Sequence, residues 1–143
     1  MKMSSRYGDF NRALMEDLRA NEGRATSGPF KGKDVLILHT KGAKSGEERE
    51  AVLGYLPDNG HYILIASKGG APSHPSWYHN LVANPETTIE VLGKKIRVRA
   101  RITAGDERDR LFAKVGATAP GYLEYQQRTS RTIPVIVLEP LKQ

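Results

Sequence analysis

Short β-type runs separated by turn residues constrain the fold of this chain more than any other feature. Six such runs, rich in Val, Ile and Leu, are expected at 34–40, 50–57, 61–67, 87–92, 95–103 and 133–138. The sequence DNG at 58–60 separates the second run from the third, and Gly93 separates the fourth from the fifth; both are typical of tight hairpins. Pro134 predicts that the last run lies at the edge of a sheet. Runs joined mostly by hairpins predict an antiparallel sheet.

Three further segments are expected to be helical, at 9–20, 75–82 and 106–115, and the Tyr-rich segment 121–128 is expected to be a short helix or turn. Six strands with three or four helices predict an α+β, mainly β fold, in which helices cover the openings of an antiparallel barrel. No repeat, low-complexity tract or linker interrupts the sequence. We therefore expect one domain over 1–143, with an N-terminal helix and its connection at 1–33.

The composition excludes several classes of site and suggests a compartment. The chain contains no cysteine, which excludes thiolate metal sites, disulfides and a cysteine nucleophile. Its four histidines lack the spacing of a metal site. No apolar run is long enough to span a bilayer, and the N-terminus lacks the apolar core of a secretory signal. The sequence thus predicts a cytoplasmic protein.

An excess of positive charge favours an anionic partner. The chain has 22 Lys and Arg against 16 Asp and Glu, a net charge of +6. A phosphate-bearing cofactor, a nucleic acid and an acidic membrane surface would each suit this charge. The basic clusters at 41–49 and 94–101 lack the interleaved aromatic residues of single-strand binders, and no helix-turn-helix or zinc-finger spacing is present. We therefore expect no nucleic-acid partner.

The first candidate site is the link HTKGAKSGEERE at 39–50, which carries more charge and glycine than a hairpin needs. Lys44, Ser45 and Gly46 supply a cation, a hydroxyl and a close backbone approach, and Arg49 can bind phosphate or carboxylate with its guanidinium fork. The alternative is a solvated hairpin tip, in which these cations pair with the neighbouring glutamates. Composition alone leaves both interpretations open.

The second candidate site is ASKGGAPSHPSWYHNL at 66–81, which leaves a predicted strand and enters a predicted helix. Gly69 and Gly70 would let a flat ligand lie against the main chain. The first turn of the helix offers free N–H groups to an anion, and Trp77 and His79 are further donors. The alternative is a mobile loop with Trp77 plugging the barrel end. Two glycine-bearing loops at the ends of neighbouring strands together predict a cleft for a long, flat, anionic cofactor.

Three ordered motifs carry a resemblance to a known family: TKGAKSGEER, ASKGGAPSHPSWYHNLVANP and YLEYQQRTSRTIPVIVLEP. Together they resemble the deazaflavin-dependent nitroreductase family, the branch of the split β-barrel flavoprotein superfamily that uses coenzyme F-420. The resemblance covers about 35–140. It implies a split β-barrel that binds an 8-hydroxy-5-deazaflavin with a phospholactyl-oligoglutamate tail. It also implies hydride transfer from the reduced coenzyme to an electron-poor small molecule such as a quinone, an activated alkene or a nitro compound.

The resemblance also implies roles for the residues of both loops. Lys44, Ser45 and Arg49 would hold the phosphate and the acidic tail, with Gly46 in the same turn and Lys41 close to the glutamates. The residues that would line the deazaflavin ring through their backbone are Ser67, Lys68, Gly69 and Gly70, with Ser67 near the reacting face; Trp77 would donate toward the phosphate and Asn80 would support the same region.

Tyr122 and Tyr125 are the candidate substrate contacts implied by the resemblance. Three residues apart, they would share one face of a short helix and could donate to an acceptor that gains negative charge on oxygen. Packing on the barrel rim explains the two tyrosines equally well. Arg128 and Arg131 would either close over the cofactor or cap a strand. Ser67, Tyr122 and Tyr125 are thus the predicted catalytic residues.

Other functions remain open on the sequence alone. An FMN-binding oxidoreductase on the same barrel, and a non-catalytic carrier of the deazaflavin or of a lipophile, would use the same cleft. Peripheral association with the inner face of the cell membrane through the N-terminal helix is a further alternative, although Glu16 and Asp17 make that helix a poor amphipathic anchor. The strand pattern does not choose between a monomer and a homodimer.

Overall fold

The computed structural model of the chain describes residues 6–142, with side chains described from residue 11 onward. The helices are α1 (Arg6–Ala20), α2 (Ser76–Ala83), α3 (Gly105–Thr118) and α4 (Gly121–Gln127), together with a 3₁₀ turn, η1 (Lys68–Gly70). The strands are β1 (Val35–Lys41), β2 (Glu48–Gly54), β3 (Leu56–Asp58), β4 (His61–Ile65), β5 (Glu86–Val91), β6 (Lys94–Ile102) and β7 (Val135–Pro140). None of the helices in this described part is long and apolar enough to cross a membrane.

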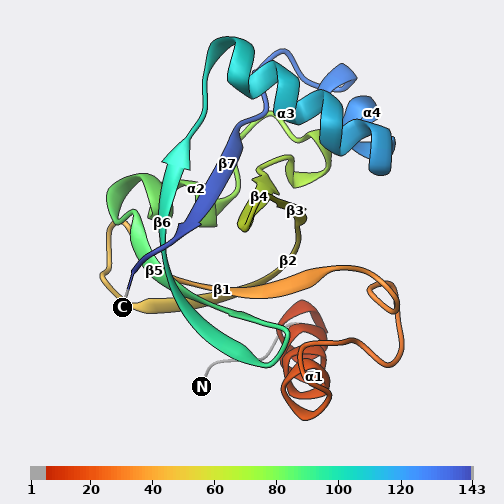
Figure 1. The fold of residues 1–143 in the computed structure, drawn as a ribbon, viewed down its shortest axis with the longest axis vertical. Coiled ribbons are helices and arrows are strands. Elements are labelled where there is room, and N and C mark those ends of the chain that lie inside the picture. The colour runs from red at the N-terminus through yellow and green to blue at the C-terminus, as the bar shows by residue number, and fades with distance from the viewer. Residues whose placement is uncertain (1–5, 143) are drawn as a thin grey trace.

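The seven strands form one antiparallel sheet with the order β2-β1-β5-β6-β7-β4-β3. This confirms the predicted antiparallel barrel architecture, with seven strands in place of six. The two edge strands, β2 and β3, are consecutive in the chain, and only Tyr55 lies between them. The sheet therefore curls until its two edges approach each other, as the path of the chain from β2 up to β3 shows (Figure 1).

The prediction of one strand over 50–57 is wrong, because the chain changes partners at Tyr55. Before this residue β2 pairs with β1, and after it β3 pairs with β4. The Tyr55 N–H donates to the carbonyl of Asp34, 3.2 Å away, outside either ladder. At this break the chain passes from one edge of the sheet to the other, although its apolar sequence pattern continues without interruption.

Both predicted hairpins are confirmed. Asn59 and Gly60 connect β3 to β4 with φ angles of 51° and 81°, and Leu92 and Gly93 connect β5 to β6 with φ angles of 49° and 79°. Two successive positive φ angles are the geometry of a type I′ turn, whose twist matches that of the flanking strands.

The prediction of an edge position for the last strand is wrong. β7 lies between β6 and β4, where Ile136 pairs with both Ile102 and Leu64. Pro134 precedes the strand, and its carbonyl accepts a hydrogen bond from the Ala66 N–H at 3.0 Å. The missing N–H of proline therefore does not interrupt the ladder.

Three apolar clusters hold the helices on the sheet. The inside of the barrel is filled by side chains that include Leu38, Leu64, Ile89 and Leu138, with Leu81 of α2 closing one end. A second cluster packs α3 and α4 against β4 and β7 through residues such as Leu111, Phe112, Ile133 and Val135. Leu14 and Leu18 of α1 cover Val35 and Ile37 of β1 in the third cluster.

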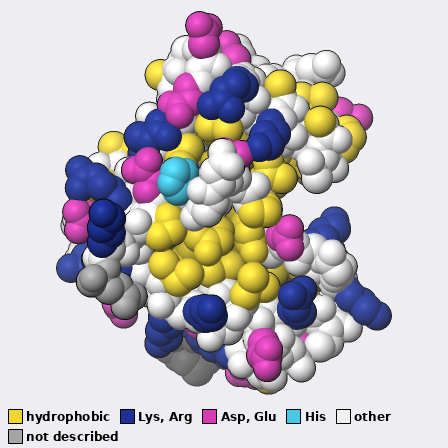
Figure 2. Space-filling view, viewed as in Figure 1, with side chains coloured by type: hydrophobic (Ala, Val, Ile, Leu, Met, Phe, Trp, Pro, Cys, Tyr) yellow, Lys and Arg dark blue, Asp and Glu magenta, His cyan; other side chains and the backbone are white. Residues whose placement is uncertain are grey.

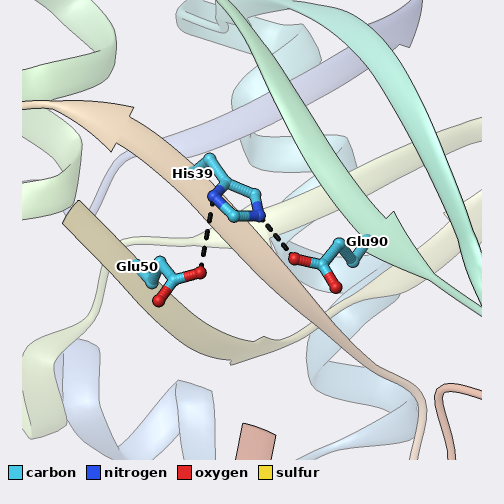
Figure 3. A group of neighbouring side chains, drawn as sticks. All are labelled: His39, Glu50 and Glu90. Carbon is cyan, nitrogen blue, oxygen red and sulfur yellow. Dashed lines mark hydrogen bonds and ion pairs between the residues drawn. The ribbon is translucent and has the colours of Figure 1, made fainter. Parts of the chain in front are cut away.

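An ion-pair network adds to the attachment of α1. Arg19 donates to both oxygens of Glu90, at 2.9 and 2.8 Å, and to Glu50 at 2.7 Å. His39 lies between the same two carboxylates, with Nε2 2.6 Å from Glu90 (Figure 3). Hydrogen bonding from Arg19, and secondarily from His39, lowers the pKa of Glu90 to about 2. The Arg19 guanidinium already binds both carboxylates and offsets part of their charge, so the cluster is poorly suited to a metal cation.

Candidate functional site

A groove of about 1170 Å³ runs between the free edge of β2 and the end of β4. In the space-filling view, hydrophobic side chains gather at the centre of one face, between the part that carries α3 and α4 and the part that carries α1, with Lys and Arg side chains around them (Figure 2). Ten of the predicted site residues line the groove: Lys44, Ser45, Arg49, Ser67, Lys68, Gly69, Trp77, Asn80, Tyr122 and Tyr125. The structure thus brings both glycine loops and the tyrosine pair to one cavity.

The first loop is a compact turn between β1 and β2. The Gly42 N–H donates to the carbonyl of Glu47 at 2.7 Å, and the Gly46 N–H donates to the carbonyl of Gly42 at 2.9 Å. Gly46 has a φ of 73°, a left-handed conformation that glycine adopts without strain. Across the described part of the chain, the N–H groups of Lys44 and Ser45 have no partner. Two adjacent free N–H groups in a turn form a nest for an anion.

Asn80 of α2 fixes this loop from the barrel side. Its Oδ1 accepts a hydrogen bond from the Ala43 N–H at 2.9 Å, and its Nδ2 donates to the hydroxyl of Thr40 at 3.1 Å. Both Asn80 and Thr40 are buried. The predicted supporting position of Asn80 therefore has a specific geometry, in which one side chain joins α2 to the start of the loop.

The cations of the first loop have different surroundings. Arg49 pairs with Glu47 at 3.1 Å, as the solvated-tip interpretation requires, but both side chains are exposed and such a pair is weak. Lys44 has no carboxylate partner within the described residues and lines the groove. Lys41 lies outside the groove, in a separate polar cavity that also contains Lys95. Lys41 is thus separated from the other predicted loop residues.

The second loop follows β4 and contains three consecutive positive φ angles, at Lys68 (47°), Gly69 (64°) and Gly70 (84°). A Cβ built on Gly69 would meet no atom within 4 Å, so the main chain is open to the groove at that point. A Cβ on Gly70 would lie 2.8 Å from the carbonyl oxygen of Tyr125, so this glycine allows α4 to approach. The sequence predicted that both glycines let a flat ligand approach the main chain, but only Gly69 faces the groove, whereas Gly70 faces α4.

The N–H groups of Ser67, Lys68 and Gly69 have no partner among residues 6–142. Ser67 is buried, and its own carbonyl accepts from the Gly70 N–H at 2.9 Å. A row of free donors beside an open glycine is suited to a planar ligand with carbonyl and ring-nitrogen acceptors.

The first turn of α2 adds a third set of donors. The helix begins at Ser76, one residue later than predicted, with Pro75 as its N-cap and no capping side chain. Ser76 and Trp77 both line the groove. Because the amide groups of a first helical turn have no intrahelical partner, they present positive potential to the groove. Trp77 packs against the barrel core, as the plugging interpretation requires, and also lines the groove, where its binding role stays a prediction.

Tyr122 and Tyr125 meet with their ring centroids 5.9 Å apart in an edge-to-face contact. Both also pack against the cluster of α3 and β7, as the rim interpretation predicts. Burial, with a smaller contribution from Tyr125, raises the pKa of Tyr122 above its ordinary value. The hydroxyl of Tyr122 therefore stays protonated at neutral pH and is available as a donor in the groove.

Sequence reasoning did not identify several groove residues. Phe30, in the connection after α1, and Asn11 of α1 also line the groove. Phe30 is an isolated aromatic residue in a Gly- and Ser-rich segment, and this isolation was the signal available for it. Thr40 carries no signal of its own, because its contact with Asn80 is long-range.

Comparison with known proteins gives consistent matches. A family model described as F420H(2)-dependent quinone reductase matches residues 10–140. A Mycobacterium tuberculosis protein described as an F420H(2)-dependent quinone reductase is 46% identical over 106 residues, covering 72% of this chain and 71% of the relative. A solved structure of an F420-H2 dependent reductase (FDR-A) superposes with a TM-score of 0.68 at 40% identity, covering 74% of this chain and 94% of its own. A chain described as a domain-swapped dimer superposes with a TM-score of 0.70 at 38% identity, covering 92% of this chain and 98% of its own.

Proposed function

Because the chain belongs to the F420H(2)-dependent quinone reductase family, we propose that its groove holds coenzyme F-420 between the two glycine-bearing loops. The protein is an oxidoreductase that uses this coenzyme, as the sequence motifs implied, and the family assignment answers the choice between F-420 and FMN. The family description names a quinone as the acceptor. Reduction of nitro compounds and activated alkenes by this chain stays a prediction.

The observation that carries the placement is that two separate sets of free N–H groups line the same groove. In our proposal the N–H groups of Lys44 and Ser45 bind the phosphate, and Lys44 and Arg49 attract the acidic tail. The N–H groups of Ser67 and Gly69 then face the ring, where the open space above Gly69 admits a flat ligand. When bound, the deazaflavin supplies the hydride, and the protein supplies position and electrostatics.

The tyrosine pair serves the acceptor side of the site. A quinone that receives a hydride gains negative charge on oxygen and needs a hydrogen-bond or proton donor. Tyr122 and Tyr125 line the groove, and neither hydroxyl has a hydrogen-bond partner within the described residues. We assign them the role of donors to the acceptor, with Ser67 near the reacting face of the coenzyme.

Titration of the purified protein with coenzyme F-420 and with FMN tests the proposal. We expect saturable binding that is tighter for F-420, together with oxidation of the reduced coenzyme when menadione is added. Binding without turnover would support the carrier alternative. Absence of binding, or equal affinity in the Lys44→Ala and Arg49→Ala variants, would contradict the placement.

The assembly and location of the protein are separate proposals. The structural neighbour described as a domain-swapped dimer, at 38% identity, supports a homodimer for this chain. Light scattering after gel filtration measures this directly, and a monomeric mass across the concentration range would reject it. Peripheral membrane association through α1 would be tested by sedimentation with vesicles that contain anionic lipids, and recovery of all protein in the supernatant would argue against it.

A further inference from the structure

Arg131 lies beneath the second loop and binds it through all three guanidinium nitrogens. Nε donates to the carbonyl of Ala71 at 2.8 Å, and Nη2 donates to the carbonyl of Ser67 at 2.7 Å. Nη1 donates to the carbonyl of Ala66 at 3.2 Å and to Nδ1 of His74 at 2.9 Å. One side chain therefore binds the segment 66–74 at four points, and the sequence alternative in which Arg131 caps a strand end is the closer description.

These bonds fix the direction of two amides of the second loop. The carbonyls of Ala66 and Ser67 point toward the guanidinium, so the N–H groups of Ser67 and Lys68, on the opposite side of the same two planar peptide bonds, point away from it and are free. The segment contains Lys68 with a φ of 47°, a conformation that is unfavourable for a residue with a Cβ. External contacts must hold such a segment in place, and Arg131 supplies them.

The contact with His74 constrains its protonation state. Arginine can only donate hydrogen bonds, so Nδ1 of His74 must be the acceptor and carry no proton. The other groups that face the His74 ring belong to α2: Tyr78, with ring centroids 4.7 Å apart, and His79, at 5.7 Å. Among the described residues no carboxylate contacts His74 or Arg131. Burial, then the charge of Arg131 and then His79, lower the pKa of His74 below its ordinary value.

We propose that Arg131 is a positioning residue for the coenzyme, which orients the free N–H groups of Ser67 and Lys68, and that this clamp requires neutral His74. Protonated His74 would direct an N–H toward a guanidinium N–H across 2.9 Å and place two cations side by side. The clamp would then lose one acceptor and gain a repulsion, and the loop would bind the coenzyme less well at low pH. The inference rests on the proposed position of the ring at this loop.

The first test replaces Arg131 by lysine, which keeps the charge but cannot bind four acceptors from a planar fork. We expect Arg131→Lys to weaken the binding of coenzyme F-420 by about tenfold, the loss typical of one or two charged hydrogen bonds. The KM for the reduced coenzyme should rise while the KM for menadione changes little. Wild-type affinity in a folded Arg131→Lys protein, judged by circular dichroism, would overturn the positioning role.

The second test replaces His74 by a residue that cannot be protonated but can still accept the hydrogen bond from Arg131. The side-chain oxygen of asparagine can replace Nδ1, so His74→Asn should bind the coenzyme as well as wild type at about pH 8 and better than wild type at about pH 5. The ionisable groups of the coenzyme contribute equally to both proteins, so the difference between the two pH profiles isolates His74. His61→Asn, at the far end of β4, is the matched control and should follow the wild-type profile.

The outcomes separate this inference from the proposed function. Parallel profiles for wild type and His74→Asn would overturn the requirement for neutral His74, even where Lys44→Ala weakens binding as expected. No binding by wild type at any pH would instead contradict the placement of the coenzyme. If Arg131→Lys does not fold, the pH dependence of coenzyme binding by His74→Asn still tests the clamp. A purely structural role for Arg131 predicts the same pH dependence for His74→Asn and for wild type.

Discussion

The side-chain oxygen of Asn80 accepts a hydrogen bond from the backbone N–H of Ala43, 2.9 Å away and 37 positions earlier in the chain. This bond connects α2, whose first turn faces the groove, to the loop that offers the anion nest. One buried side-chain amide therefore holds the loop between β1 and β2 in place against α2.

Asn80→Ala should lower both stability and coenzyme affinity. The substitution leaves the Ala43 N–H and the Thr40 hydroxyl without their partner, which costs about 1–3 kcal/mol in the free energy of unfolding. Chemical denaturation and coenzyme titration measure the two effects. Asn84→Ala, an exposed neighbour at the end of α2, is the control and should change neither. A stable Asn80→Ala protein with full affinity would show that the bond is dispensable.

Lys44→Ala and Arg49→Ala should weaken coenzyme binding, and more so for coenzyme with a long glutamate tail. Because the side chains are exposed, the effect should be largest at low ionic strength and shrink as salt is added. Lys94→Ala removes an equal charge from the β5–β6 hairpin and serves as the control. Lys41→Ala tests the sequence prediction that Lys41 lies close to the glutamate tail, because the structure places Lys41 in the neighbouring cavity. A loss of affinity confined to long-tailed coenzyme would extend the site to that cavity, and unchanged affinity would exclude Lys41 from the site.

Tyr125→Phe should slow turnover while leaving coenzyme affinity intact. The ring remains to pack against Tyr122, and only the hydroxyl that would donate to the acceptor is lost. We expect kcat with menadione to fall by at least about tenfold, the loss typical of one hydrogen bond to a charged group. Tyr122→Phe tests the second donor, and Tyr62→Phe, inside the barrel, controls for a lost hydroxyl elsewhere. Unchanged kcat in both groove variants would remove the donor role.

Acid should weaken the attachment of α1 through Glu90. Its pKa is lowered from 4.5 to about 2, so the folded state binds this proton less readily than the unfolded state. The stabilisation is present above the unfolded value and is lost as the pH falls toward about 2. Glu90→Gln should therefore cost about 1–3 kcal/mol near neutral pH, the range for lost hydrogen bonds to a charged group, and much less near pH 2, measured by urea denaturation at both. An equal cost at both pH values would argue against the ion pair.

Gly70→Ala should destabilise the protein more than Gly69→Ala. Both glycines have positive φ, which costs alanine about 1 kcal/mol. Only at Gly70 would the new Cβ meet the backbone of α4, at 2.8 Å from the Tyr125 carbonyl. Gly69→Ala should instead act on the ligand, because its Cβ enters the groove. Thermal unfolding and coenzyme titration distinguish the two, and a larger loss of Tm in Gly69→Ala would contradict this assignment.

Local signals allowed much of the fold to be predicted. The turn at Asn59 and Gly60 needs only two residues that tolerate positive φ, and the helix at α2 begins next to a proline. The break at Tyr55 could not be predicted, because the apolar pattern continues through it and the change of partner depends on β1 and β4. The edge position predicted from Pro134 was wrong for the same reason, since the place of β7 in the sheet is decided by strands far away in the chain.

The candidate site divides in the same way. Lys44, Ser45 and the segment from Ser67 to Gly69 could be identified as a ligand site because their chemistry is visible in short motifs. The separate roles of Gly69 and Gly70 could not, because they depend on the position of α4. Arg131 was visible as a charged residue, but its four acceptors lie 57 to 65 positions earlier in the chain.

The single residue between β2 and β3 has a consequence for the size of molecule that the groove admits. No interstrand bond joins β2 to β3 in the part of the chain that is described, so at this seam the backbone is held by Tyr55 and its bond to Asp34 and not by a ladder. A bulky polycyclic molecule that presses on this seam would therefore meet side chains and would have no interstrand ladder to break.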